Sequence, residues 1–138
     1  MQQTLIIIKP DAVRNRYAGH IVTRFEQEGF VIKEARLMTL DRKDAESFYA
    51  EHKGKPFFDG LVAFMSSGPC LPIVLEGSDV ILRVRALIGA TQPAKAAPGT
   101  IRALYAGALR GEDGAANAIH ASDSPVSASR EIPFFFSR

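Results

Sequence analysis

Cysteine and long apolar runs are nearly absent from this sequence. Its 138 residues include one cysteine, Cys70, so no disulfide can form within the chain. The apolar neighbours of Cys70 predict a buried thiol rather than a reactive one. The apolar run Leu5–Ile8 is far too short to span a membrane, and the residues before it lack the basic region of a signal peptide. We therefore expect a cytoplasmic protein with no membrane partner.

An excess of one sign of charge is also missing. The chain has 17 Lys and Arg against 15 Asp and Glu, which gives a formal net charge of +2. Proteins whose main partner is nucleic acid usually show a cluster of Lys and Arg, so we do not expect nucleic acid to be the primary partner of this chain. The length and the 46% share of hydrophobic residues predict one domain over residues 1–138.

The glycine-rich loops that commonly hold phosphates are absent: the sequence contains neither GxxxxGK[ST] nor GxGxxG. A nucleotide would therefore have its phosphates held by side chains. Arginine suits a two-pronged phosphate contact and lysine a point-charge contact. The basic and hydroxyl groups that are candidates for this are Lys9, Tyr49, Arg85, Thr91 and Arg102.

The hydrophobic pattern that is present predicts strands alternating with helices. The β-branched run 4–9 predicts a strand buried on both faces, and Pro10-Asp11 predicts a turn after it. Pro72 lacks a backbone donor inside another predicted strand, so we expect an irregularity there, and Asp41 is expected to cap a helix. Strands are predicted over 4–9, within 30–40, over 70–76 and up to residue 120, and helices over 18–28, after 41, and over 57–65, 79–88 and 103–109. This order predicts an α+β fold of the split βαβ kind.

One histidine near the end of the sequence has unusual neighbours. His120 ends a short apolar run, Ser122 and Asp123 follow almost at once, and Glu131 comes some residues later. Imidazole titrates near neutrality, so a neutral His120 can act as a nucleophile while a carboxylate orients its ring. A lone histidine is more often a surface residue or a satisfied core residue, and on this stretch alone both interpretations stay open.

Several other motifs accompany this histidine, and together they resemble the nucleoside diphosphate kinase family from Thr4 to Phe136. The motifs that carry the resemblance are Ile8-Lys9-Pro10-Asp11, Lys55-Pro56-Phe57-Phe58, Ser67-Gly68-Pro69, Gly89-Ala90-Thr91, Pro98-Gly99-Thr100-Ile101-Arg102 and Asn117-Ala118-Ile119-His120-Ala121-Ser122-Asp123-Ser124. The resemblance implies a ferredoxin-like, four-stranded antiparallel sheet covered by helices. It also implies a homo-oligomer, either a tetramer or a hexamer.

The resemblance implies a role for each candidate residue. His120 would be the nucleophile, and Ser122 and Glu131 would position its ring, with Glu131 on the nitrogen that does not attack. The residues implied in binding are Lys9 on the transferred phosphate and the ribose, Tyr49 near that phosphate, Phe57 under the base, Arg85, Thr91 and Arg102 on the phosphates, and Asn117 on the 3′-hydroxyl. Spacing alone makes Tyr49 equally well a core aromatic. Phe58 is expected in the core, Asp123 is expected to be structural, and His20 and His52 are expected on the surface.

The reaction that the resemblance implies is a ping-pong transfer. His120 would take the γ-phosphate of a nucleoside triphosphate and pass it to a nucleoside diphosphate bound in the same site. Mg²⁺ is expected to arrive on the nucleotide phosphates, because the sequence shows no carboxylate cage for a resident metal.

Several features depart from the usual family pattern, among them Ala103-Leu104 in place of a pattern that usually contains Asp. The segment between Arg102 and Asn117 is several residues longer, Ala121 stands where glycine is common, and Gln92 stands where Asn or Asp is usual. A methyl group at position 121 would crowd the backbone beside the phosphate. The lengthened segment and Ala121 motivate an alternative function, a nucleotide-binding or phosphohistidine signalling module with little turnover.

Overall fold

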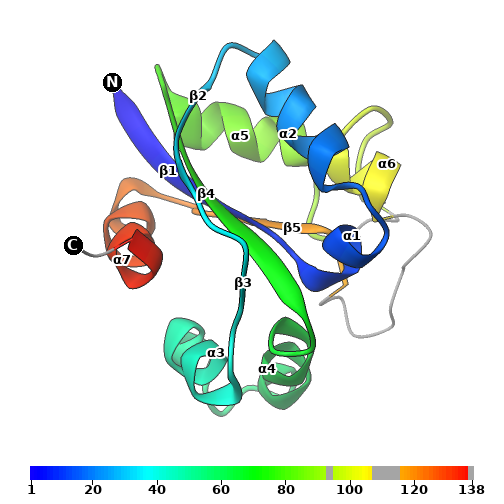
Figure 1. Ribbon diagram of the computed structural model, residues 1–138, viewed down its shortest axis with the longest axis vertical. Helices are drawn as coiled ribbons and strands as arrows, with labels where there is room; N and C mark the ends of the chain where they lie inside the picture. The colour runs from blue at the N-terminus through cyan, green and yellow to red at the C-terminus, as the bar shows by residue number, and fades with distance from the viewer. Residues whose placement is uncertain (93–94, 107–115, 137–138) are drawn as a thin grey trace.

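β1 (Gln2–Ile8) is the central strand of the molecule, and the computed structural model describes residues 1–92, 95–106 and 116–136 of the chain around it (Figure 1). Every side chain from Thr4 to Ile8 is buried. Leu5 and Ile7 pack into one hydrophobic cluster and Ile6 and Ile8 into another, because successive side chains of a strand point to opposite faces. The predicted strand, buried on both faces, is confirmed.

The sheet has the predicted split βαβ topology. Its strands follow the order β2-β4-β1-β5, and every pair is antiparallel. The other strands of this path are β2 (Val31–Ala35), β4 (Pro69–Gly77) and β5 (Ile119–Ala121). A two-residue strand, β3 (Met38–Thr39), also pairs with β4 and adds to the four strands expected.

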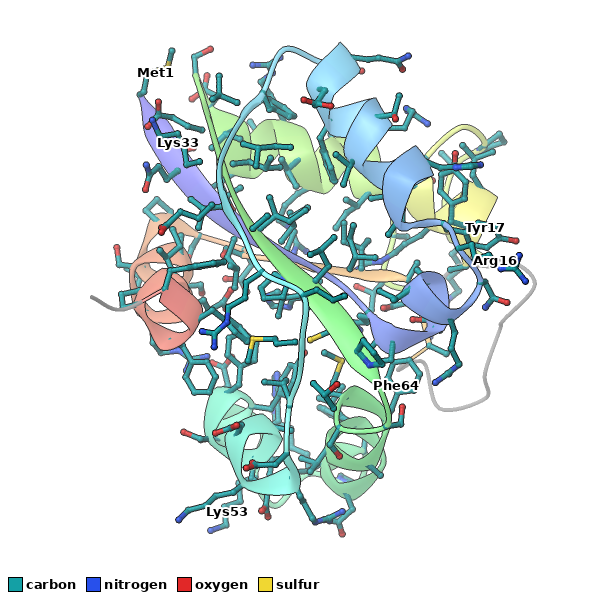
Figure 2. The ribbon with its side chains drawn as sticks, viewed as in Figure 1. Met1, Arg16, Tyr17, Lys33, Lys53 and Phe64 are labelled. Carbon is teal, nitrogen blue, oxygen red and sulfur yellow. The ribbon has the colours of Figure 1, made fainter. Side chains whose placement is uncertain are left out.

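Helices cover both faces of this sheet. They are α1 (Pro10–Arg14), α2 (Ala18–Gln27), α3 (Arg42–Phe48), the 3₁₀ turn η1 (Ala50–His52), α4 (Phe58–Met65), α5 (Val80–Ile88), α6 (Ile101–Tyr105) and α7 (Pro125–Phe136). On one face α2 and α5 contribute Phe25 and Val84 to the core. On the other face α3, α4 and α7 contribute Phe48, Met65 and Phe135. Figure 2 shows side chains filling the space between the sheet and these two layers.

Proline accounts for two differences from the sequence prediction. Pro10 begins the short helix α1 where a simple turn was expected, since proline suits the first position of a helix. Pro72 sits within β4 without interrupting its pairing to β1. The Pro72 carbonyl accepts from the Arg36 amide at 3.1 Å, so the side of Pro72 that lacks a donor faces the gap between β2 and β3. The expected irregularity is therefore not a break in β4 but the break between β2 and β3, the strands that pair with it.

The C-terminal helix α7 was not predicted. It follows Ser124, whose hydroxyl accepts from the Ser127 amide at 3.1 Å, and it contains Pro133 in its interior. The strand that was expected to end at His120 is β5, which has His120 at its centre. Of the helix expected over 103–109, residues up to 105 lie in α6, and 107–109 fall outside the described residues. Within the described part, no helix is both long and apolar enough to cross a membrane.

Candidate active site

A cleft of about 480 Å³ brings the predicted site residues together. The residues that line it include every predicted one except Ser122: Lys9, Tyr49, Phe57, Arg85, Thr91, Arg102, Asn117, His120 and Glu131. They come from β5, from the helices α5, α6 and α7, and from segments between elements, so only the fold makes them neighbours. Ser122 is fully buried behind the cleft wall.

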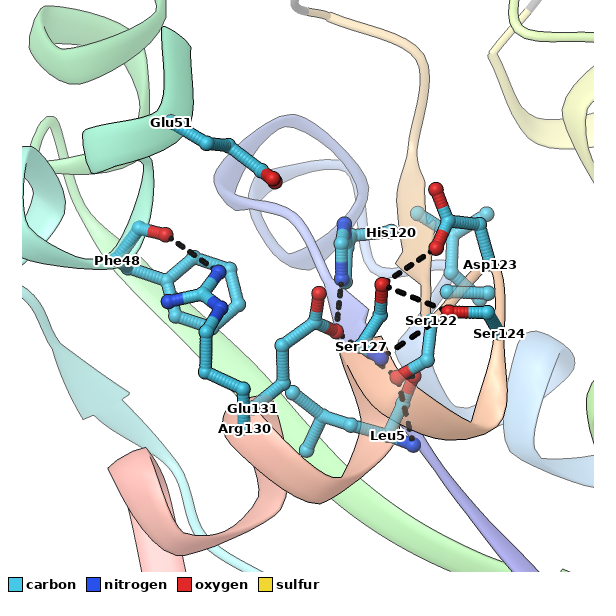
Figure 3. Close-up of polar contacts among 12 residues, drawn as sticks. Leu5, Phe48, Glu51, His120, Ser122, Asp123, Ser124, Ser127, Arg130 and Glu131 are labelled. Atoms are coloured by element: carbon cyan, nitrogen blue, oxygen red, sulfur yellow. Dashed lines mark hydrogen bonds and ion pairs between the residues drawn. The ribbon is translucent and has the colours of Figure 1, made fainter. Parts of the chain in front are cut away.

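His120 is held by a carboxylate on one of its ring nitrogens. Its Nε2 lies 2.8 Å from Glu131 Oε1, and the side chains of His120 and Glu131 are 20% and 5% exposed. An ionised carboxylate only accepts hydrogen bonds, so Nε2 carries the hydrogen. Figure 3 shows the other ring nitrogen, Nδ1, pointing away from Glu131. The imidazole is thus fixed in the tautomer that leaves a lone pair on Nδ1.

Ser122 fixes the carboxylate in turn. Its hydroxyl donates to Glu131 Oε1 at 2.8 Å, and its backbone amide donates to the Leu5 carbonyl on β1. β5 and β1 pair beside it, with Ile7 opposite His120. Ser122 and the strand pairing thus hold His120 and Glu131 in a fixed position relative to β1.

Arg130 and Asp123, neither of them a predicted site residue, also line the cleft. The Arg130 guanidinium donates to the Phe48 carbonyl at 2.9 Å and so ties α7 to α3 (Figure 3). Asp123 accepts from the Ser127 hydroxyl at 2.5 Å, and this hydrogen bond lowers the pKa of its carboxyl. The Asp123 contact holds the start of α7 and the Arg130 contact holds its middle, next to Glu131.

Lys9 and Asn117 form a polar pair at the inner end of the cleft. Lys9 Nζ donates to Asn117 Oδ1 at 2.7 Å, and both residues are almost fully buried. Asn117 Nδ2 donates to the Thr91 carbonyl at 3.0 Å. The structure thus joins three predicted residues that are far apart in the sequence.

Two arginines lie close together on the same side. Arg85 donates to the Ala121 carbonyl at 3.1 Å, and Arg102 donates to the Gly89 and Ile119 carbonyls at 3.0 and 2.7 Å. Burial, and secondly the nearby charge of Arg85, lowers the pKa of Arg102 to about 10. Within the described residues neither arginine forms an ion pair with a carboxylate, and Arg102 Nε has no hydrogen-bond partner. Paired guanidinium groups with spare donors favour an anionic ligand such as phosphate.

Aromatic side chains form the opposite wall. Tyr49 is buried, and its hydroxyl has no hydrogen-bond partner in the described part of the chain. Burial, together with the charges of Glu131 and Cys70, raises the pKa of Tyr49, so the hydroxyl remains a donor. Phe57 is 45% exposed, whereas its neighbour Phe58 is buried in the core as expected.

His52 was expected on the surface, and its side chain is 30% exposed. It also lines the cleft, with its ring 5.3 Å from the ring of Phe57 and 6.3 Å from that of Tyr49. The expected position of His20 on the exposed face of α2 is confirmed.

A strained turn lies between Asn117 and β5. Ala118 has a φ of 74°, and the Ile119 amide donates across it to the Asn117 carbonyl at 2.9 Å, which makes a γ-turn of the strained kind. A residue other than glycine in such a conformation costs about 1–3 kcal/mol. The Ala118 amide donates to Asp11 Oδ2 at 3.0 Å, and burial raises the pKa of that carboxyl. Asp11 was not predicted as a site residue.

The structure also bears on the departures in sequence. Ala121 is an ordinary strand residue of β5, so its methyl group causes no backbone strain. Gln92 lines the cleft. Most of the lengthened segment, residues 107–115, lies outside the described residues.

The cleft is poor in groups that would hold a metal ion. Its carboxylates are Glu51, Asp123 and Glu131, and Glu131 is already bonded to His120 and Ser122. The described residues contain no group of three or more His, Cys, Asp or Glu side chains that would ligate a metal. The donor set of the cleft suits an anion.

Comparison with known proteins identifies one family. The family model described as "Nucleoside diphosphate kinase" matches residues 2–138. The nucleoside diphosphate kinase of Sorangium cellulosum is 54% identical over 136 residues, which cover 99% of this chain and 91% of that protein. Nucleoside diphosphate kinase 2 of Protochlamydia amoebophila is 52% identical, with 99% and 92% covered.

Solved structures agree with the sequence comparisons. The nucleoside diphosphate kinase of Aquifex aeolicus superposes with a TM-score of 0.91 at 50% identity, covering 99% of this chain and 95% of that one. The enzyme of Halobacterium salinarum, in complex with CDP, superposes with a TM-score of 0.92 at 44% identity, covering 99% and 88%.

Proposed function

The chain belongs to the nucleoside diphosphate kinase family and is a phosphotransferase acting on nucleotides, and we propose that it works by a ping-pong mechanism through His120. In the first half-reaction the γ-phosphate of a nucleoside triphosphate moves to His120. In the second it moves to a nucleoside diphosphate bound in the same cleft. The observation that carries this proposal is the 2.8 Å contact between His120 and Glu131 at the wall of a cationic cleft.

The first step is an in-line displacement by His120 Nδ1. A bond forms between Nδ1 and the γ-phosphorus, the bond to the bridging oxygen breaks, and the nucleoside diphosphate leaves with that electron pair. The imidazole gains positive charge as it attacks, and Glu131, bonded to the Nε2 hydrogen, stabilises that charge. The acceptor diphosphate reverses these bond changes, which restores neutral His120.

The cationic wall stabilises the transferred group. Phosphoryl transfer spreads negative charge over three equatorial oxygens, so catalysis depends mainly on positioned donors. Lys9, Arg85 and Arg102 supply positive charge, and the unpartnered hydroxyl of Tyr49 supplies a further donor. Thr91 lines the same part of the cleft and would contact the phosphates through its hydroxyl.

The outer part of the cleft suits the nucleoside. Phe57 presents an exposed ring on which any base can stack, since every base has a π-face. Asn117 and Lys9, which are hydrogen-bonded to each other, would contact the sugar 3′-hydroxyl deeper in the cleft. The complex of the Halobacterium salinarum enzyme with CDP supports binding of a nucleoside diphosphate on this fold.

Mg²⁺ belongs to the substrate in this proposal. Bound to the nucleotide phosphates, the ion would neutralise part of their charge. The protein side chains bind the remaining phosphate oxygens and do not need to form a metal cage.

We also propose a cytoplasmic homo-oligomer, tetrameric or hexameric as the family resemblance implies. β2 is an edge strand of the sheet, and Val31 within it and Leu37 just beyond it are 52% and 64% exposed. Exposed edge strands that carry apolar side chains are common sites of pairing with another chain. Sedimentation equilibrium would measure the assembly, and a monomer at micromolar concentration would contradict this part of the proposal.

Steady-state kinetics with ATP and a diphosphate of a different base test the proposed function. A ping-pong enzyme gives parallel double-reciprocal lines as the second substrate is varied. His120→Ala should abolish transfer, whereas His20→Ala, a histidine outside the cleft, should leave it unchanged. Intersecting lines, or a His120→Ala variant with full activity, would overturn the mechanism.

A further inference from the structure

We propose that Asp11 is a positioning residue for the transfer reaction, because its carboxylate holds the strained turn that places Asn117 and His120. This inference rests on the proposed function of those two residues. It assigns to Asp11 a task that its place in the sequence, directly after Lys9-Pro10, does not indicate.

The turn at Ala118 is held from both sides by the corner between β1 and α1. The Ala118 amide donates to Asp11 Oδ2 at 3.0 Å, and the Ala118 carbonyl accepts from the Lys9 amide at 2.8 Å. Ala118 is fully buried, and Asp11 is 1% exposed. With both of its backbone groups bonded to the same corner, Ala118 stays at a φ of 74°, which alanine rarely adopts.

This conformation has consequences on both sides of Ala118. Before it, Asn117 faces Lys9 Nζ at 2.7 Å. After it, β5 starts at once, with Ile119 opposite Ile8 and His120 opposite Ile7. β5 has only three residues, so little else sets its register. A relaxed turn would therefore displace Asn117 from Lys9 and shift His120 relative to Glu131.

The charge of Asp11 also interacts with that of Lys9, so a test has to separate this charge from the hydrogen bond to Ala118. Oδ1 of Asp11 is buried and has no hydrogen-bond partner among the described residues. A buried carboxylate with one oxygen unused is costly, and the bond that its other oxygen makes to a strained backbone amide explains why such a group is placed there. An amide oxygen of asparagine can accept the same bond, so Asp11→Asn separates the bond from the charge.

The test uses three substitutions in the full chain, read out by the rate at which ATP phosphorylates His120 in a single turnover. Asp11→Ala should slow this step by about 10- to 100-fold, because small displacements of reacting groups cost that much. Asp11→Asn should stay within about threefold of the parent chain, because it keeps the acceptor. Ala118→Gly placed in the Asp11→Ala background should restore most of the rate, because glycine adopts a positive φ without being held.

Asn15→Ala is the matched control. Asn15 ends α1 and donates from its side chain to the Asp11 carbonyl at 2.8 Å, so its loss loosens the same helix while leaving the Asp11 carboxylate in place. It should leave the rate unchanged. If Asp11→Ala is as active as the parent chain, or if Ala118→Gly fails to rescue it, the positioning role is wrong.

Two further outcomes are decisive. If Asp11→Ala does not fold but the double variant with Ala118→Gly folds and reacts, the positioning role is supported. If neither variant folds, Asp11 stabilises the core beyond the turn, and the positioning role is wrong. If the parent chain itself never phosphorylates His120, the proposed function fails. Amide exchange at Ala118 then decides on its own, since Asp11→Ala should accelerate it and Asp11→Asn should not.

Discussion

Glu131 receives two hydrogen bonds on a single oxygen, one from the His120 ring and one from the Ser122 hydroxyl. The two donors act differently. In the proposed reaction the His120 ring gains charge, whereas Ser122 stays neutral and only limits the movement of the carboxylate. We therefore expect the negative charge of Glu131 to matter more for the rate than the hydrogen bond from Ser122.

Glu131→Gln should lower the rate of His120 phosphorylation by about 100-fold or more, because the charge that stabilises the imidazolium is lost. Ser122→Ala should lower it by less than about tenfold, since one neutral hydrogen bond contributes roughly 1 kcal/mol. Rapid-quench measurement with labelled ATP compares the two variants. Equal losses in both would contradict the separate roles given to charge and position.

At this scale the sequence identified residues by resemblance and missed those that act through the backbone. Lys9, Asn117 and His120 lie in recognisable motifs, and the structure brings them to one cleft. Asp11 and Arg130 bond to the main chain of residues 107 and 82 positions away. No spacing in a sequence predicts such contacts, because any residue offers the same backbone groups.

α7 is the helix that the sequence pattern did not predict. Pro125 and Pro133 both read as helix breakers, yet Pro125 occupies the first helical position, where a missing donor has no cost. Ala128, Ile132 and Phe135 follow helical spacing and pack into the core, which offsets the cost of Pro133. β1, by contrast, was predictable, because a short continuous run of apolar, β-branched residues is typical of a strand that is buried on both faces of a sheet.

Pro133→Ala should raise the free energy of unfolding by about 1–2 kcal/mol, since an interior proline removes a helical hydrogen bond while restricting the unfolded chain only modestly. Transfer activity should not change, because Glu131 keeps its contacts. The urea midpoint measures the effect, and Pro125→Ala in the same helix serves as the control that should bring no gain. A lower midpoint for Pro133→Ala would show that the proline fits this helix without cost.

Over the whole molecule, positively charged side chains gather in one cleft. The net charge is only +2, yet Lys9, Arg85 and Arg102 face one cavity. Ligands that bind only the folded state stabilise it, by about 2.7 kcal/mol when present at 100 times their Kd. The folded protein should therefore be most stable when a phosphate-bearing ligand is bound.

Calorimetry with ADP should show a higher unfolding temperature than with adenosine at the same concentration, because only ADP pairs with the arginines. MgCl₂ alone should give little shift, and Mg²⁺ with ADP should give the largest, if the ion comes with the nucleotide. Equal shifts from adenosine and ADP would contradict a site built for phosphate. A shift from MgCl₂ as large as that from ADP would contradict the substrate-borne ion.

The most direct test of the central claim is a single-turnover experiment with γ-labelled ATP and Mg²⁺, followed by a chase with a different nucleoside diphosphate. We predict an acid-labile, base-stable label on His120 that moves quantitatively to the added diphosphate. A label that never forms would contradict the assignment of His120 as the nucleophile. A label that forms and stays would identify a phosphohistidine module rather than a kinase that turns over.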